Sequence, residues 1–224
     1  MNISIADDIS EIIPHAALGV ISYSVEVEKS SGKLIDHFRQ TVDGIAQKYE
    51  LQEIAAIPNI QATREAYKAL GKSPSQYRNA AEAMLRRVVK GNGLYEINNV
   101  VDLQNLISIR SGYTIGSYDQ AKLTGDITLQ KTEAEMRYVG IGDREVNIGN
   151  MPVLFDEQGP FGNPTADSER AMITEGKRNV ISILYSFHPD REQLQKWLDE
   201  YELELNRLTN AEHVETKIID GKMG

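Results

Sequence analysis

The side chains that could carry out metal-dependent or nucleophilic chemistry are few and scattered. The four histidines, His15, His37, His188 and His213, show no spacing typical of metal ligands, and the absence of cysteine removes thiolate ligands, cysteine nucleophiles and disulfides. The sequence contains no Gly-x-Ser-x-Gly elbow, phosphate-binding loop or dinucleotide fingerprint. Among the 33 Asp and Glu residues, no pair stands out for acid–base work. We therefore expect no metal and no cofactor.

Positive side chains gather in one part of an otherwise acidic chain. The net charge of −9 disfavours nonspecific nucleic-acid binding, because phosphate contacts need cations. Between Ala62 and Lys90, however, seven Lys and Arg residues stand against two Glu, a local charge of +5. We name this segment the basic island; its cations are Arg64, Lys68, Lys72, Arg78, Arg86, Arg87 and Lys90. Such an island fits a small RNA contact, and it equally fits a solvated helix face.

Four residues of the basic island are candidates to bind RNA. Arg78, Arg86 and Arg87 would contact phosphate, and Tyr77 would stack on a base. Helical spacing also lets Glu82 pair with Arg78 and with Arg86, since each lies four residues away. The two roles compete for the same guanidinium groups.

A run of amide and carboxylate side chains after the basic island carries a family resemblance. The segment from Ser73 to Asp119 contains Asn98-Asn99-Val100-Val101-Asp102, then Asn105, and ends in Tyr118-Asp119. It resembles the editing domain of the phenylalanyl-tRNA synthetase beta subunit. In that domain a helix and a glycine turn lead into an Asn-Asn-Val-Val-Asp-x-x-Asn stretch, a short helix and a Pro-x-His-Ala-Phe-Asp-like turn.

The resemblance implies a fold, a reaction and a partner. We expect one compact α/β (α+β) domain over residues 1–224, a mixed sheet with flanking helices, with the likeness clearest over 64–187. A synthetase pocket for phenylalanine rejects tyrosine only about a hundredfold, so the family's domain hydrolyses the mischarged ester. Nothing resembles the ATP-binding synthetase core, which excludes aminoacylation by this chain. The implied partner is tRNA or aminoacyl-tRNA, with no DNA and no membrane.

Two side chains of the central stretch are carried over to the family's pocket. Asn105 occupies the position of the pocket asparagine, whose amide would hold the amino acid or the terminal ribose; the alternative is a bond to backbone at a helix start. Gln104 stands where bacterial synthetases often carry threonine. Asp102 precedes a helical run and is expected to cap it.

Three further positions complete the implied pocket and include its main departure. Gly116 stands where the family has its pocket histidine, and Ser117 offers a hydroxyl nearby unless it is only a turn serine. Glu169 falls at the glutamate that the family uses against a tyrosine hydroxyl, or else it is an exposed loop acid. Asp167-Ser168 replaces the family's flanking glycine pair.

Three functions stay open on these residues. The first is a stand-alone proofreader that hydrolyses mischarged aminoacyl-tRNA in trans through water held by Gln104, Asn105, Gly116, Ser117 and Glu169. The second is a noncatalytic RNA- or aminoacyl-binding module, favoured by the lost histidine and the negative charge. The third is a pocket reused for another amino-acid-like molecule without RNA. The basic island counts against the third.

The hydrophobic pattern predicts which elements position these side chains. Alternation over residues 18–27 predicts a strand, with Ile21, Tyr23, Val25 and Val27 on one side, and apolar spacing over 34–49 predicts a helix. Further predicted helices cover about 62–70 after a loop at 57–59, then 74–89 opened by Ser73-Pro74, a run from near 102, and 194–208. Short strands are predicted at 126–130, 135–139, 152–155 and 179–187, with a shaped loop at 159–168.

The N-terminal segment and the overall hydropathy bear on location. The first residues, MNISIADDISEIIP, place acids where a signal peptide needs basic residues, and no apolar run approaches the length of a bilayer span. We therefore expect a cytoplasmic protein.

Overall fold

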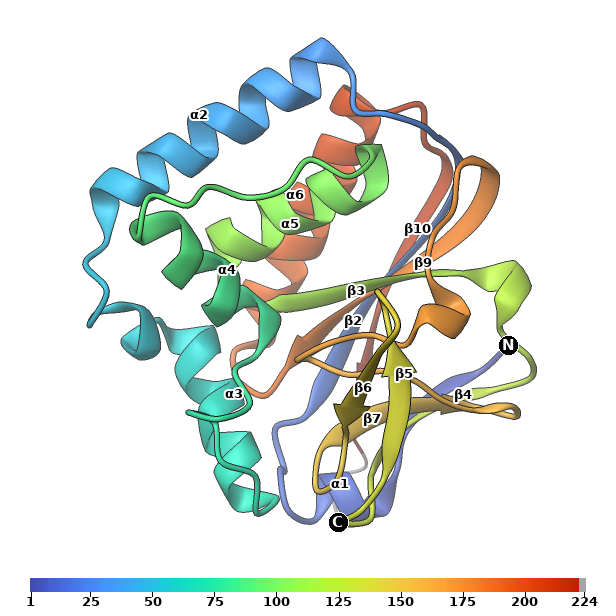
Figure 1. Cartoon of the computed structure of the whole chain (residues 1–224). Helices are drawn as coiled ribbons and strands as arrows, with labels where there is room; N and C mark the ends of the chain where they lie inside the picture. Colours follow the sequence, from blue (N-terminus) through green and yellow to red (C-terminus); the bar gives the residue numbers. More distant parts are fainter. Residues whose placement is uncertain (222–224) are drawn as a thin grey trace.

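The strands form two four-stranded sheets and one hairpin (Figure 1). The long sheet is antiparallel, with the strand order β10 (Glu212–Asp220), β2 (Ala17–Val27), β9 (Gly176–Ser186) and β3 (Thr114–Asp119). The small sheet has the order β1 (Ile3–Ile5), β4 (Ile127–Lys131), β7 (Pro152–Asp156) and β8 (Gly159–Gly162), and only its β1–β4 pair is parallel. The hairpin joins β5 (Arg137–Gly140) to β6 (Arg144–Asn147). The computed structural model describes residues 1–221.

Helices cover the face of the long sheet that is turned away from the small sheet (Figure 1). They are α2 (Gly32–Lys48), α5 (Asn99–Ser111) and α6 (Arg191–Leu208), with α4 (Ala80–Val89) packed beside α2 and α5. The helix α3 (Pro58–Ala69) instead contributes Ala66 to the cluster between the two sheets. A one-turn helix α1 (Asp7–Ser10) follows β1, and short 3-10 turns occupy η1 (Ile54–Ala56), η2 (Gln120–Lys122) and η3 (Glu169–Ala171). The result is an α+β domain with a mixed small sheet and flanking helices, as the sequence predicted.

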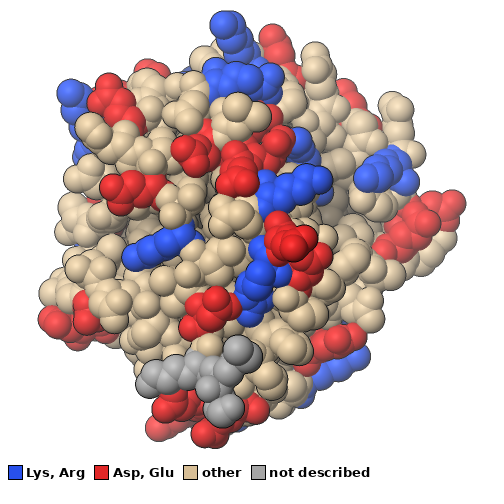
Figure 2. Space-filling view, turned by 180° about the vertical axis from the view of Figure 1, so that it is seen from behind, with Lys and Arg blue, Asp and Glu red and all other residues tan. Residues whose placement is uncertain are grey.

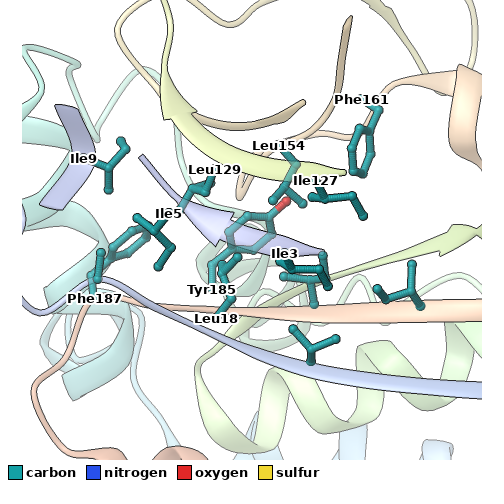
Figure 3. Packing of buried hydrophobic residues seen from close by; sticks show 14 of the residues in the cluster. Ile3, Ile5, Ile9, Leu18, Ile127, Leu129, Leu154, Phe161, Tyr185 and Phe187 are labelled. Atoms are coloured by element: carbon teal, nitrogen blue, oxygen red, sulfur yellow. The ribbon is translucent and has the colours of Figure 1, made fainter. Parts of the chain in front are cut away.

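The long sheet separates two hydrophobic cores because its side chains alternate between its faces. Leu18, Val20 and Tyr185 point to the small sheet, where they pack with residues such as Ile127 and Leu154 (Figure 3). On the opposite face, a second core forms under the helices from Ile21, Tyr23, Val25, Leu106, Leu198 and their neighbours. We refer to these as the inter-sheet core and the helix-side core.

Tyr118 of β3 joins the two sheets by filling a slot between two glycines. A Cβ atom added at Gly116 of β3 would lie 2.0 Å from the Tyr118 Oη atom, and one added at Gly162 of β8 would lie 2.1 Å from the same atom. The ring is fully buried and meets the Phe161 ring edge-on at 4.9 Å. Residues without side chains at 116 and 162 are therefore a steric condition for the phenol to lie there.

Several predicted elements are confirmed. The strand predicted at 18–27 is β2, with Ile21, Tyr23, Val25 and Val27 all buried, and the helices predicted at 34–49 and 194–208 are α2 and α6. The strands predicted at 126–130, 152–155 and 179–187 are β4, β7 and β9. The strand predicted at 135–139 is β5, which begins two residues later.

Three helices begin at other residues than predicted. The loop expected at 57–59 is already the start of α3, with proline at its first position. Ser73-Pro74 opens a turn closed by the Tyr77 amide on the Ser73 carbonyl, and α4 begins at Ala80 after Asn79, whose side chain accepts from the Glu82 amide.

The same correction applies to α5, which begins at Asn99 and not near Asp102. Its cap is Asn98, whose side-chain oxygen accepts from the amides of Val100 and Val101 at 3.1 and 2.9 Å. Asp102 lies in the first turn and is buried; it accepts from the Ile97 amide at 2.8 Å and from the Ser30 hydroxyl at 2.5 Å. The carboxylate thus ties the segment before the helix to its first turn without being the cap.

Two segments expected to be irregular are strands. The turn that the resemblance implied up to Tyr118-Asp119 is β3, and the first four residues of the loop expected at 159–168 are β8. The strands β1, β6 and β10 were not predicted at all. The first two are short, and β10 alternates only weakly between half-buried and exposed residues.

The glycine slot makes a prediction about stability. Gly116→Ala and Gly162→Ala should each lower the free energy of unfolding by about 1–3 kcal/mol, because the new methyl overlaps the buried Tyr118 phenol. Urea unfolding measures the effect. Gly44→Ala in α2 is the matched control: open space surrounds it, so the change should stabilise by about 0.5–1 kcal/mol. Equal effects at all three positions would contradict the steric argument.

Candidate functional site

The five residues predicted to bind substrate do not meet in one pocket. Gly116 and Ser117 are neighbours on β3, so they face opposite sides of the long sheet. Gln104 and Asn105 are half-buried on α5, which covers the helix side. Glu169 is exposed at the start of η3. Gly116 alone of the five borders the inter-sheet core.

Ser117 belongs to a buried hydroxyl network on the helix side. Its Oγ atom lies 2.6 Å from Ser182 Oγ, which also contacts the hydroxyls of Tyr23 and Tyr201 at 3.2 and 3.3 Å. Ser117 is buried, with 9% of its surface exposed, so its hydroxyl bonds within the protein. Ser117 is therefore neither a turn serine nor open to a ligand in this conformation.

Asp167 is the carboxyl group that faces a tyrosine hydroxyl. Tyr118 donates to its Oδ1 atom at 2.8 Å, and the Asn163 amide donates to the same atom at 3.3 Å. Because Tyr118 has one proton and gives it to Asp167, the Tyr185 hydroxyl, 2.9 Å away, is the donor to Tyr118. The Oδ2 atom has no hydrogen-bond partner among the residues that the structure describes.

The surroundings of Asp167 favour its protonated form. Burial raises the pKa of Asp167 to about 7, against which the hydrogen bonds from Tyr118 and Asn163 act only in part. Burial also raises the pKa of Tyr118, Tyr138 and Tyr185, so these phenols stay neutral at physiological pH. The group is thus one carboxyl that titrates near neutrality among neutral hydroxyls, an arrangement able to hold or release one proton.

The loop from Asn163 to Ser168 gives this group its shape. The Asn163 side chain accepts from the amides of Thr165 and Ala166 at 2.7 and 3.1 Å and donates to the Tyr138 hydroxyl at 2.6 Å. Tyr138 in turn donates to the Ala166 carbonyl.

The sequence analysis singled out Glu169 and missed Asp167, two residues earlier. The sequence signal for Asp167 was an acid at a position where the family has glycine.

In the basic island, three arginines surround one buried carboxylate. The Glu82 side chain is 0% exposed; Arg64 donates to both of its oxygens at 3.0 and 2.9 Å, and Arg86 donates at 2.9 Å. Arg78 Nε lies 3.8 Å from the same carboxylate and its side chain is 48% exposed. The predicted pairing of Glu82 with Arg78 and Arg86 is confirmed. Arg78 therefore keeps the most accessible guanidinium of the three.

The other two RNA candidates contact neighbouring side chains. Tyr77 is half-buried, with the Lys72 ammonium 3.8 Å from its ring centroid, and Arg87 lies 4.5 Å from the ring centroid of the exposed Tyr95.

Two cations of the basic island, Arg64 and Lys68, line a groove of about 300 Å³ together with Gln52, Ala55, Ala56, Gln61 and Glu65. Arg64 is thus shared between the buried carboxylate and an open groove.

The face seen from behind does not extend the basic island. Figure 2 shows acidic and basic side chains interspersed there, without a continuous basic field. Any electrostatic attraction for a polyanion must then come from a limited area elsewhere, since like charges need to cluster to attract phosphates.

Comparison with known families identifies the domain type. The B3/4 domain family matches residues 62–215, well over half of the chain, and the chain therefore belongs to the B3/4 domain family. The predicted resemblance to the phenylalanyl-tRNA synthetase beta subunit is confirmed.

One matching solved structure is an N-terminal fragment of the phenylalanyl-tRNA synthetase beta subunit from Pyrococcus horikoshii. The identity is 13% and the TM-score 0.46, and the match covers 97% of this chain but 50% of the fragment. This chain thus spans half the length of that fragment, and we draw nothing about function from so distant a likeness. No curated protein sequence matches significantly.

Two further observations concern the described residues only. None of their helices combines the length and the apolar composition needed to cross a membrane. Within residues 1–221, no three His, Cys, Asp or Glu side chains converge in a way that could hold a metal ion.

The raised pKa of Asp167 predicts a pH dependence of stability. Between about pH 4 and about pH 7, a carboxyl with a pKa of about 7 when folded and 3.8 when unfolded is protonated mainly in the folded state. The contribution of Asp167 to stability is therefore fully present below about pH 4 and is lost as pH rises to about 7. Asp167→Asn should remove this contribution, up to about 1.4 kcal/mol per pH unit. Denaturant unfolding across that range measures it.

Glu169→Gln is the matched control, since it removes an exposed acid two residues away. It should leave the pH dependence of the wild type in place. If Asp167→Asn and the wild type show the same slope, the Asp167 carboxyl is ionised in the folded protein and the pKa argument is wrong.

Proposed function

We propose that this B3/4 domain binds tRNA and recognises its aminoacylated end. The observation that carries the proposal is the family match over residues 62–215, which contains the whole basic island. Cations that stay accessible despite the pairing with Glu82 support it further, above all Arg78 and the groove cations Arg64 and Lys68. The partner is tRNA or aminoacyl-tRNA, and the setting is translation in the cytoplasm.

The proposed RNA contact is small and electrostatic. Three arginines around one carboxylate leave a local excess of positive charge, and Glu82 fixes the guanidinium groups in place. Guanidinium groups held in this way lose less side-chain entropy on meeting phosphate than free ones would. Arg78 would bind phosphate, and Tyr77, Arg86 and Arg87 would border the contact.

Hydrolysis of mischarged aminoacyl-tRNA in trans is the catalytic form of this proposal. An aminoacyl ester is already activated, so an oriented water is sufficient and no protein nucleophile is needed. The resemblance assigns Asn105, Glu169, Gln104, Gly116 and Ser117 to the substrate. Because the Ser117 hydroxyl is enclosed and the five do not meet in one pocket, the proposal uses Asn105 and Glu169 and requires a rearrangement to bring them together. Asp167 is an additional candidate to hold or accept a proton, because its pKa is raised to about 7.

A noncatalytic aminoacyl- or tRNA-binding module is the second candidate, and one observation favours it. The space beside Gly116, where the family carries its histidine, is filled by the Tyr118 phenol. A histidine cannot simply be restored there, since its Cβ atom would overlap the Tyr118 hydroxyl. Water orientation by an imidazole at this position is therefore closed to this chain.

The RNA proposal predicts a specific loss of affinity. Arg78→Ala should weaken tRNA binding and reduce the slope of log K against log salt by about one, because one phosphate contact is lost. Fluorescence anisotropy with labelled tRNA over a salt series measures both. Lys196→Ala on α6 removes another exposed charge, outside the island, and should change neither. An unchanged curve for Arg78→Ala would move the RNA site elsewhere.

Arg86→Ala serves a different purpose, because Arg86 binds the buried Glu82. Its loss should lower the free energy of unfolding by about 1–3 kcal/mol by leaving a buried carboxylate short of a donor. Its effect on tRNA must therefore be measured where the variant is fully folded.

The catalytic form predicts deacylation. Pure protein incubated with a panel of correctly and wrongly charged tRNAs should release the amino acid from at least one mischarged species. Asn105→Ala should then lower turnover, because the ester is misplaced in a reaction that depends on orientation. Glu169→Ala should alter which side chain is accepted. If tRNA binds and no species is deacylated, the noncatalytic module stands and the enzyme does not.

A further inference from the structure

The outer edge of β10 is an unpaired strand edge. β10 is the last strand of the long sheet, and among residues 1–221 its backbone pairs only with β2 (Figure 1). The Gly221 amide donates to the Ala16 carbonyl at 3.2 Å, so this residue faces β2. Backbone groups alternate along an antiparallel pair, which directs Lys217 and Ile219 to β2 and leaves Thr216 and Ile218 facing outward.

The central side chains of this edge, Glu215, Thr216 and Lys217, are complementary to themselves in one antiparallel register. With Thr216 opposite Thr216 of a second copy, Glu215 lies opposite Lys217 of that copy, and the same pair recurs on the other side of the axis. Val214 then lies opposite Ile218. Registers centred on Glu215 or on Lys217 place like charges opposite each other, which destabilises them.

The fold supports the same register. Val214 and Ile218 both pack against the helix-side core, so the apolar pair would continue that core across the axis. The pairing of β10 with β2 shifts register between Glu212 and Glu215, and His213 has a positive φ of 53°. Regular pairing with β2 therefore begins at Glu215, after a bulge that contains His213 and Val214, so the regular part of the exposed edge starts at Glu215.

We propose that a second copy of this chain pairs with β10 about a two-fold axis through Thr216 and joins two long sheets into one of eight strands. Thr216 would exchange two backbone hydrogen bonds with its counterpart. Charged side chains usually protect an edge against foreign strands. Here the order Glu215-Thr216-Lys217 disfavours the two registers shifted by one residue and favours pairing with the chain's own copy. This interface is independent of the proposed RNA function.

Sedimentation equilibrium of the full chain over a concentration series tests the proposal. The wild type should be a dimer that dissociates on dilution. Lys217→Glu and Glu215→Lys should each raise the dissociation constant roughly tenfold, because two attractive pairs become repulsive. The double charge swap should restore dimerisation. Lys90→Glu, a charge reversal beyond the end of α4, should have no effect.

Thr216→Pro separates assembly from folding. The Thr216 amide faces outward, so proline removes no bond to β2 but removes both bonds across the axis. The variant should remain folded by circular dichroism and thermal unfolding, and it should be a monomer. A wild type that stays monomeric at the highest concentrations overturns the proposal, and so does a dimer that none of the β10 variants weakens.

Discussion

The phenol of Tyr118 fixes how closely the two sheets approach each other. It lies where side chains at Gly116 and Gly162 would otherwise be, one from each sheet, and its hydroxyl binds Asp167 in the loop that follows β8. Sheet spacing, loop shape and the surroundings of one half-buried carboxyl thus depend on a single ring. The same ring occupies the place that the family resemblance gives to an active-site side chain. The position of the Tyr118 ring and the lack of a side chain at Gly116 therefore depend on each other.

A buried carboxylate organises the basic island in a comparable way. Glu82 would be costly to bury alone, and Arg64 and Arg86 satisfy it while keeping part of their own surface in water. Sequence charge counts treat all seven cations of the island as equal. In the structure they differ in how available they are to a ligand. A guanidinium that binds the buried Glu82 carboxylate cannot move to contact a ligand without a cost in stability.

The sequence predicted the long, strongly periodic elements and the family, and it failed where tertiary contacts decide. β2, α2 and α6 follow from apolar spacing because each buries one continuous face. The start of α4 was misplaced because Ser73-Pro74 has the composition of a cap, whereas Asn79 forms the cap. The candidate site was predicted only in part: the arginine pairs of Glu82 follow from helical spacing, but the role of Asp167 depends on Tyr118 and Tyr185, 49 residues before it and 18 residues after it in the chain. No local pattern encodes such a meeting.

The long sheet also separates the tryptophan from part of the buried tyrosines. Trp197, the one tryptophan of the sequence, packs on the helix side with the Arg110 guanidinium 5.6 Å from its ring centroid. Tyr118 and Tyr185 lie in the inter-sheet core, whereas Tyr23, Tyr113 and Tyr201 lie in the helix-side core. Tryptophan emission therefore monitors the helix-side core alone, and the absorbance of buried tyrosines carries a signal from both cores. Since coincident transitions by different probes are the mark of all-or-none unfolding, this cysteine-free chain carries its own means of reporting whether its two halves melt as one cooperative unit.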